Sequence, residues 1–426
     1  MSQKYVRFVG IDWGSEKHQA CVIDAKGKRK EWSFAHSSAG LADLVKRLER
    51  MAAGHPEQIA VGIETPRSAI VEICIERGFH VFSINPKQLD RFRDRHSVAG
   101  AKDDRLDAFV LADSLRSDEH CYRRVQLDGP LVIQLRELSR LDEDLTQEKV
   151  RLCNKLGAQL NRYYPQLLPL CSAVDALWFW ALLERAPTPA AGRSLSEDEL
   201  VRLLATYRIR RVTAQQLRAA LQEKALQVGP GVAEAASLHV NSLVERLRLI
   251  ERPRQCCDEQ LKAMLKQISE GSHPEASPGR PSDVEILQSF AGAGPTVTAV
   301  FLSEAAQPVA SRDYQALRLY SGVAPVTRAT GKRSGNRASI GMRRGCSHRL
   351  RWAMHIWAKN SVLHDPRSRS HYEELRNRGH GYARTLRGVG DRLLKVLVAA
   401  LRDGRLYDAQ RDGRPLVRAN KEVPSR

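Results

Sequence analysis

The chain has 426 residues, and its 68 Lys and Arg against 49 Asp and Glu give a formal net charge of +19 at pH 7. That length allows two or three domains with separate cores, and the positive charge favours a polyanionic partner, because basic side chains on phosphates release condensed counterions. The sequence shows no signal peptide, lipidation signal, basic amphipathic amino terminus or long apolar run, so nucleic acid is favoured over a membrane and we expect a soluble cytosolic protein.

The first part of the chain, to about residue 125, alternates strand and helix signals. Apolar residues with helical spacing from Leu41 to Leu48, and a second run that stops before Gly78, predict helices. A meander of three strands followed by strand–helix alternation predicts a mixed sheet with helices against its faces. The expected strands cover 5–12, 18–37 (two strands around a turn at 25–27), 58–65 and 79–86.

Two long helices are expected in the middle of the chain. Leu131, Leu138, Leu145 and Leu152 recur every seven residues, which predicts one helix to about residue 164 with a coiled-coil seam. A second helical pattern covers 232–268, and Pro253 should interrupt and kink it. The two helices could pair antiparallel.

The segment between these helices, about 165–230, is expected to be a small helical insertion of unknown role. One of its helices should start at Ser194 or Ser196, and Ser194 has Glu197 three residues later, as in a capping box. The expected parts of the whole chain are an α/β domain (1–125), a helical region with this insertion (126–270), a linker (271–283), a mainly helical domain (284–410) and a basic tail (411–426).

Acidic residues stand where the strands of this basic chain end. Asp12 and Glu64 each follow an apolar strand run, and Asp104 and Asp107 are three residues apart on the next helix. Four converging carboxylates would repel one another without a cation, and Mg²⁺ prefers carboxylate oxygens. A metal pair there could act on a phosphodiester. Taken singly, each residue could instead be a turn or cap, and Asp103 or Asp104 could simply cap the helix.

A second candidate region lies near the carboxyl terminus. A Gly-rich turn with Gly292 and Gly294 separates two helical runs, as in a helix-hairpin-helix whose turn amides hold a backbone phosphate. The stretch after it, 326–352, has eight basic and no acidic residues, which favours contact with a phosphate backbone. Its Ser and Thr hydroxyls could be nucleophiles on phosphorus or only phosphate contacts. The basic residues are Arg328, Lys332, Arg333, Arg337, Arg343, Arg344, Arg349 and Arg351.

The order strand–Asp12, strand–Glu64 and then KDDRLDA resembles the RuvC-like, ribonuclease H-fold domain of the DEDD transposases of insertion sequences, relatives of the Piv-type DNA invertases. The segments VGIDWGSEKH, GIETPRSAIVE and SINPKQLDRF match successive blocks of that domain. The resemblance implies that Asp12, Glu64, Asp104 and Asp107 hold Mg²⁺ or Mn²⁺. Asp103 occupies a variable place in the motif and ranks lower.

The segment SGVAPVT and the residues that follow it resemble the C-terminal transposase domain of the same family. In that family a serine eight residues after the glycine of a Gly-x-x-Pro block joins DNA covalently. Counting from Gly322 reaches Thr330, so the nucleophile is Thr330 or, in a shifted register, Ser334; Ser339 ranks below both. A third possibility is an inactive copy.

The resemblance thus implies a RuvC-like α/β domain, a coiled-coil middle and a mainly helical C-terminal domain. The implied function is a DNA recombinase that cleaves and rejoins element ends and target DNA, with a noncoding guide RNA, as a homodimer or homotetramer in the bacterial cytoplasm at the nucleoid. One alternative is a structure-selective endonuclease of the Holliday-junction-resolvase type, which would need only the four carboxylates. The other is a nucleic-acid-binding protein with a degenerate site, which Thr330 favours.

Overall fold

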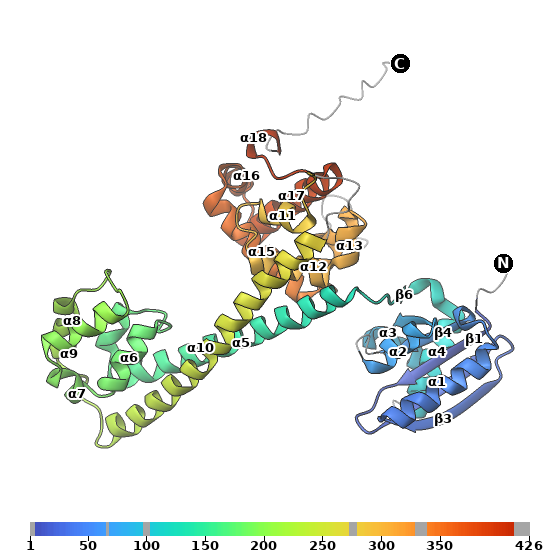
Figure 1. The fold of residues 1–426 in the computed structure, drawn as a ribbon, viewed down its shortest axis with the longest axis horizontal. Helices are drawn as coiled ribbons and strands as arrows, with labels where there is room; N and C mark the ends of the chain where they lie inside the picture. The colour runs from blue at the N-terminus through green and yellow to red at the C-terminus, as the bar shows by residue number, and fades with distance from the viewer. Residues whose placement is uncertain (1–4, 65–67, 97–102, 272–278, 329–338, 413–426) are drawn as a thin grey trace, which may run out of the picture. The chain divides into compact units, whose positions relative to one another are not determined.

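The structure is a computed structural model, and it describes residues 5–64, 68–96, 103–271, 279–328 and 339–412. The chain divides into two compact units, Met1–Asp128 and Gly129–Arg426 (Figure 1). Among the helices that the structure describes, none is both long enough and apolar enough to cross a membrane.

A mixed sheet of six strands, in the order β3-β2-β1-β4-β5-β6, forms the centre of the first unit. β1, β2 and β3 form an antiparallel meander, β4 and β5 run parallel to β1, and β6 returns antiparallel to β5. The mixed sheet predicted from the sequence is therefore confirmed. The strands are β1 (Arg7–Asp12), β2 (Lys17–Asp24), β3 (Arg29–Ala35), β4 (Ile59–Ile63), β5 (His80–Ser83) and β6 (Arg123–Arg124).

Helices cover both faces of this sheet because its central strands are buried on both sides. Val9 and Val61 face a core that includes Leu44 and Val71 of α1 and α2. Phe8 and its neighbours on the opposite face share a core with α3 and α4. These helices are α1 (Ser38–Ala52), α2 (Ala69–Glu76), α3 (Pro86–His96) and α4 (Asp104–Asp118), with short 3₁₀ turns at η1 (Pro56–Gln58) and η2 (Glu119–Cys121).

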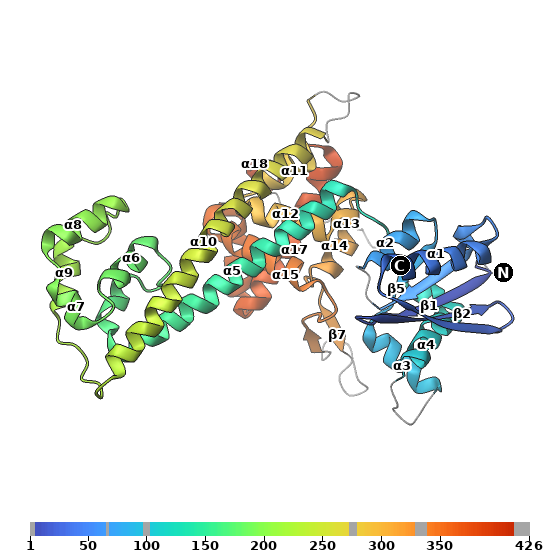
Figure 2. The ribbon, with the colours of Figure 1, turned by 60° about the horizontal axis from the view of Figure 1, so that its bottom comes forward.

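The second unit is built on two long helices, α5 (Pro130–Tyr163) and α10 (Val232–Gly271), which lie side by side (Figures 1 and 2). They run antiparallel, because the start of α5 and the end of α10 share one core whereas the end of α5 and the start of α10 share another. The expected antiparallel pair is present, and the coiled-coil seam stays a prediction.

α10 continues through Pro253, where the sequence suggested an interruption. Proline has no N–H, so the carbonyl of Leu249 loses its helical donor. Leu249 is 75% exposed, so water can take the place of that donor.

The insertion between the long helices has its own core around Trp178, Phe179 and Trp180. α8 starts after Ser196, whose side chain accepts from the amide of Glu199 while Glu199 accepts from Ser196 in return. The alternative start at Ser194 is wrong, because Ser194 ends the preceding helix. The elements here are η3 (Pro165–Leu170), α6 (Leu177–Arg185), α7 (Pro189–Ser194), α8 (Glu197–Thr206) and α9 (Ala214–Gln222).

The rest of the second unit is mainly helical and packs around Trp357, which meets Phe290 and Phe301 edge-on at 5.4 Å between ring centroids. The expected boundaries between the helical region (126–270), the linker (271–283) and the mainly helical domain (284–410) fall inside this unit, and they stay predictions. The elements are α11 (Asp283–Gln288), α12 (Pro295–Glu304), α13 (Ala306–Ala310), α14 (Tyr314–Tyr320), β7 (Val326–Arg328), β8 (Ser339–Gly341), α15 (His348–His364), α16 (Pro366–Asn377), α17 (Tyr382–Asp403) and α18 (Ala409–Asp412).

Candidate active site

Two of the four sequence-predicted carboxylates leave the same edge of the sheet. β1 and β4 are parallel neighbours in which Ile11 lies opposite Ile63. Asp12 and Glu64 follow these two residues directly, and both are half-buried. Since the carboxyl ends of adjacent parallel strands meet at one edge, the backbone holds these two side chains next to each other.

The other two carboxylates are carried by α4, which lies directly on the backbone of the central strands. A Cβ added to Gly10 would lie 2.0 Å from the carbonyl oxygen of Ala108, and one added to Gly62 would lie 3.3 Å from the carbonyl oxygen of Leu111. At Gly10 only glycine permits this approach, and at Gly62 any larger residue would be crowded. Because side chains alternate along a strand, Asp12 stands on the same face as Gly10, the face that α4 covers.

The direction of α4 brings its first turn toward the acidic edge. Gly10 is closest to Ala108, whereas Phe8, earlier on the same face of β1, shares its core with Leu111 and Leu115. α4 therefore runs back along β1, and Asp104 and Asp107 at its start lie toward the end of the strand that carries Asp12.

Asp104 and Asp107 differ in their surroundings. Asp104 is exposed, while Asp107 is only 2% exposed. The Nε of Arg93 on α3 donates to Oδ1 of Asp107 at 2.7 Å, and Nη1 of Arg93 donates to Asp90 at 2.8 Å. Partial burial of Arg93 works to lower its pKa, but its hydrogen bonds to Asp107 and Asp90 and their charges outweigh this and raise the pKa. Arg93 thus stays charged and neutralises Asp107.

Asp103 caps α4, as the plainer interpretation of the acidic cluster expected. Its side chain accepts from the amide of Arg105 at 3.3 Å, and its charge favours the positive end of the helix dipole.

The four carboxylates do not form a closed ligand group in this arrangement. Among the residues that the structure describes, the metal-type donors that gather in a group of three or more, all within 4.8 Å of one another, belong to Asp118, His120 and Cys121 at the other end of α4. The donor chemistry at the acidic edge still suits Mg²⁺ or Mn²⁺, because these are hard oxygen ligands on one sheet edge and the first turn of one helix.

A histidine pair that sequence reasoning missed supports the loop after Asp12. The amide of Gly14 donates to Nδ1 of His18 at 3.2 Å, so Nε2 of His18 carries the proton and donates to Nδ1 of His36 at 2.9 Å. His18 is 1% exposed, and burial, followed by the charge of His36, lowers its pKa. Trp13 lies against both rings. No local pattern joins the two histidines, because His18 lies on β2 and His36 follows β3, 18 residues later.

The hydroxyl candidates of the second unit are only partly visible. Thr330 and Ser334 lie outside the described residues, between β7 and β8 in the sequence. These two strands form an antiparallel hairpin in which Ser339 lies opposite Arg328.

Some basic residues of this region are among the described residues and others are not. Lys332, Arg333 and Arg337 also lie outside the described residues, while Arg343 is half-buried and Arg344 is exposed. Arg328 is part of β7.

The two glycines of the expected helix-hairpin-helix turn differ. Gly292 has a φ of +84°, and a Cβ there would lie 2.9 Å from the amide nitrogen of Ser361 on α15, so packing alone accounts for this glycine. Gly294 precedes α12 and faces open space.

Comparison with protein families supplies the deciding observation. A family model described as a transposase, of the DEDD IS110 type, matches residues 9–165, and a model of the IS116/IS110/IS902 transposase family matches residues 284–373. Both belong to one family, and together they cover more than half of the chain. The chain belongs to the DEDD-type IS110 family of transposases. That membership places it among the DNA transposases of insertion sequences.

Individual relatives agree with the family. A candidate transposase of Sinorhizobium fredii, y4uE, is 44% identical over 209 residues, which cover 49% of this chain and 58% of that relative. The mini-circle candidate transposase for IS117 of Streptomyces coelicolor is 29% identical over 97% of this chain and 98% of its own length. An IS110 insertion-element protein of the same species is 27% identical over 95% of this chain and 96% of its own length.

The family matches bear on different parts of this IS110-family transposase. The first match contains all four carboxylates, and the second contains the Gly-rich turn, the β7–β8 hairpin and α15. The insertion that follows α5 falls outside both.

Proposed function

We propose that the chain cleaves and rejoins DNA strands with two groups, the carboxylates of the acidic edge and a hydroxyl between β7 and β8. The observation that carries the proposal is the placement of Asp12 and Glu64 on neighbouring parallel strands, opposite the start of α4. We also propose that this sheet is ribonuclease H-like, which the order of its elements supports.

Asp12, Glu64, Asp104 and Asp107 would hold Mg²⁺ or Mn²⁺. The bound ion would stabilise negative charge on the phosphodiester oxygens. The chain's own contribution is positional: two rigid strand ends and a helix that glycine allows to approach them fix where the carboxylates stand. Arg93 supplies the positive charge beside buried Asp107 in the described form.

The covalent step would belong to Thr330 or Ser334. The hydroxyl oxygen attacks phosphorus and loses its proton, the bond from phosphorus to one deoxyribose oxygen breaks, and that oxygen leaves as a hydroxyl after taking up a proton. Attack by a DNA hydroxyl on the resulting ester then restores a phosphodiester and frees the side chain. Basic residues of the same stretch, such as Arg343 and Arg344, would bind the phosphates.

Further expectations rest on the family resemblance and the net charge of +19. They are a noncoding guide RNA, a homodimer or homotetramer that shares sites between subunits, location at the bacterial nucleoid, and phosphate binding at the Gly292–Gly294 turn. A plain resolvase is disfavoured, because the family match at 284–373 covers a second region that a resolvase would not need.

The experiment that tests the proposal is capture of a covalent protein–DNA ester. Full-length protein, labelled element-end DNA and Mg²⁺ are mixed, and denaturing gels with peptide mapping locate the adduct. We expect an adduct at Thr330 that Thr330→Ala abolishes and Thr330→Ser retains, or one at Ser334 that Ser334→Ala abolishes. Strand transfer without an adduct, unaffected by either alanine variant, would refute the side-chain nucleophile.

A further inference from the structure

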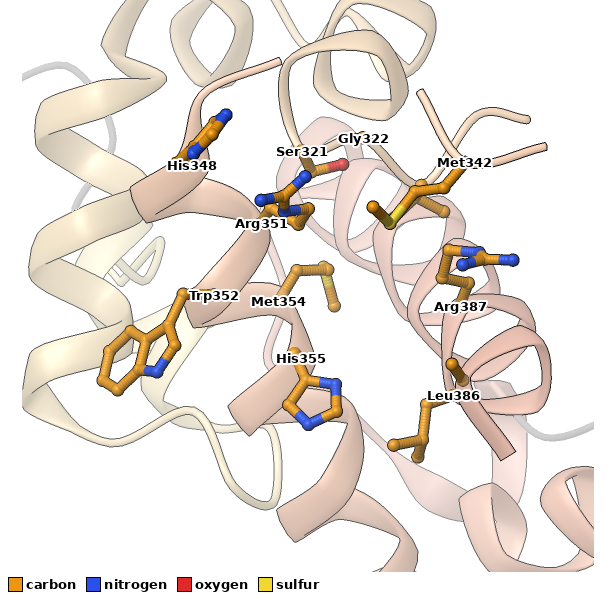
Figure 3. A pocket seen from close by; sticks show the side chains of 12 residues that line it. Ser321, Gly322, Met342, His348, Arg351, Trp352, Met354, His355, Leu386 and Arg387 are labelled. Atoms are coloured by element: carbon orange, nitrogen blue, oxygen red, sulfur yellow. The ribbon is translucent and has the colours of Figure 1, made fainter. Parts of the chain in front are cut away.

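The second unit contains a cavity of about 300 Å³ between α15 and α17, next to the β7–β8 hairpin. Figure 3 shows it between Arg351 and Met354 of α15 on one side and Leu386 and Arg387 of α17 on the other. We propose that this cavity receives one unpaired base of the DNA strand, with the adjoining phosphates on Arg351 and Arg387.

The inner wall of the cavity suits a flat aromatic ring. Val323, Met354 and Leu386 line it and are 6%, 3% and 3% exposed. Methionine sulfur makes favourable contacts with aromatic rings and adapts to their shape. A volume of about 300 Å³ lies at the lower end of the range for small-ligand pockets, which fits one base and excludes a duplex.

The charges around the cavity are all of one kind. Its ionisable lining residues are Arg351, Arg387, His348 and His355, and none is a carboxylate. Within the part of the chain that the structure describes, neither Arg351 nor Arg387 has an acidic partner. An apolar cavity with unpaired guanidinium groups at its sides is complementary to a base joined to phosphates.

A neighbouring arginine shows that α15 does pair its cations where they serve packing. Arg349 bonds to Glu143 and Glu304 and donates to Ser139, and its side chain is 17% exposed. Arg351, two residues later, makes a weak contact at 3.9 Å to the sulfur of Cys346 and pairs with no carboxylate of the described residues. Arg349 and Arg351 therefore differ: Arg349 is paired within the fold, whereas Arg351 lines the cavity.

The role of the bound base is inferred from the position of the cavity beside the β7–β8 hairpin. This step rests on the proposed function. Met342, which lines the cavity, follows β8 directly, and Ser321 to Val323, which also line it, precede β7 in the chain. A base held here would anchor the strand beside the hairpin whose sequence carries the candidate nucleophile. Enzymes that do chemistry on a base hold that base outside the duplex in a comparable pocket.

Binding to full-length protein in EDTA tests the proposal, because no strand chemistry occurs there. Fluorescence anisotropy compares an oligothymidylate with an abasic strand of equal length, which has the same phosphates and no bases. We expect the wild-type protein to bind oligothymidylate on the order of 5- to 100-fold more tightly. Ala383→Met, at the exposed mouth of the cavity, should abolish this preference and leave abasic binding unchanged.

A pair of arginine variants provides the second, independent measurement. Arg387→Ala should weaken binding of both strands, whereas Arg384→Ala, one turn earlier on α17, exposed and outside the cavity lining, should leave both nearly unchanged. Thermal melting checks that each variant is folded. No base preference in wild-type protein, the same preference in Ala383→Met, or equal effects of Arg384→Ala and Arg387→Ala would overturn the proposal. A stronger cavity-dependent preference for oligouridylate would overturn the assignment to DNA.

The results distinguish failure of the cavity proposal from failure of the proposed function. A protein that forms the covalent ester but shows no base preference in EDTA refutes the cavity alone. A protein with the base preference but no metal-dependent cleavage refutes the proposed chemistry and leaves the cavity as a nucleotide site.

Discussion

The acidic edge of the first unit and the cavity of the second unit differ in how their charged side chains are paired. At the edge, the carboxylate of Asp107 is neutralised by Arg93, whereas Arg351 and Arg387 at the cavity face no carboxylate among the described residues. Asp107 is buried, whereas Arg351 and Arg387 are half-buried, and burial makes an unpaired charge costly. A site that lacks a counter-charge, or holds one that can be released, is where a ligand can supply it. The distribution of acidic and basic side chains in the structure is therefore more informative about function than the net charge of the chain.

The largest expected effect comes from Glu64→Gln at the acidic edge, which keeps the size of the side chain and removes its charge. We expect strand cleavage in Mg²⁺ to fall on the order of 10³-fold or more, since metal stabilisation of the transition state is worth several kcal/mol, while DNA binding changes little. Single-turnover cleavage and anisotropy measure the two effects.

Asp103→Asn is the matched control, because asparagine caps a helix as well as aspartate does. It should retain activity close to that of the wild-type protein. Loss of cleavage in Asp103→Asn with retention in Glu64→Gln would show that the ligands are misassigned.

The counter-charge of Asp107 can be removed by itself. Arg93→Met leaves Asp107 buried and unpaired, so urea unfolding in EDTA should show a loss of about 3–5 kcal/mol. Added Mn²⁺ should restore part of it, and the double variant Arg93→Met/Asp107→Asn should lose less than the single one. If neither Mn²⁺ nor the double variant reduces the loss, Arg93 is not a counter-charge for this site.

The approach of α4 to the strands is tested by Gly10→Ala. The new Cβ would lie 2.0 Å from the carbonyl oxygen of Ala108, and such overpacking costs about 1–3 kcal/mol of the free energy of unfolding. Gly157→Ala, inside α5 where an added Cβ would meet nothing nearer than 3.8 Å, should not lower the stability in the same urea titrations, because alanine favours a helix over glycine. Equal stability of the two variants would contradict the close packing of α4 on β1.

Sequence periodicity predicted the sheet and the edge because both depend on local patterns. Asp12 and Glu64 follow apolar runs, and strand ends that are adjacent in a parallel sheet must meet. The partner of Asp107 was not predictable in this way, because Arg93 lies on another helix and only packing brings them together.

The helix boundaries likewise depended partly on local sequence and partly on packing. Ser194 and Ser196 both have an acidic residue three positions later, so local sequence left two starts for α8, and the packing of α7 decided between them. The course of α10 through Pro253 depends on exposure at Leu249, which no local pattern specifies.

The smallest expected effect concerns the histidine pair behind Asp12. The pKa of His18 is lowered in the folded protein, first by burial and then by His36, so the unfolded chain binds more protons below about pH 6.5. The resulting stability is present above that pH and is lost as the pH falls, by at most about 1.4 kcal/mol per pH unit. Urea titrations between neutral and mildly acidic pH measure it. His18→Gln should flatten the dependence, and an unchanged slope would assign it to other groups.

The central claim is that the four carboxylates form the metal-dependent centre of this transposase. A structure determined with Mn²⁺, located by its anomalous scattering, tests it most directly. We predict a peak among Asp12, Glu64, Asp104 and Asp107, with the guanidinium of Arg93 moved away from Asp107. A peak only at Asp118, His120 and Cys121, or none at the sheet edge at a Mn²⁺ concentration that supports cleavage, would contradict the account.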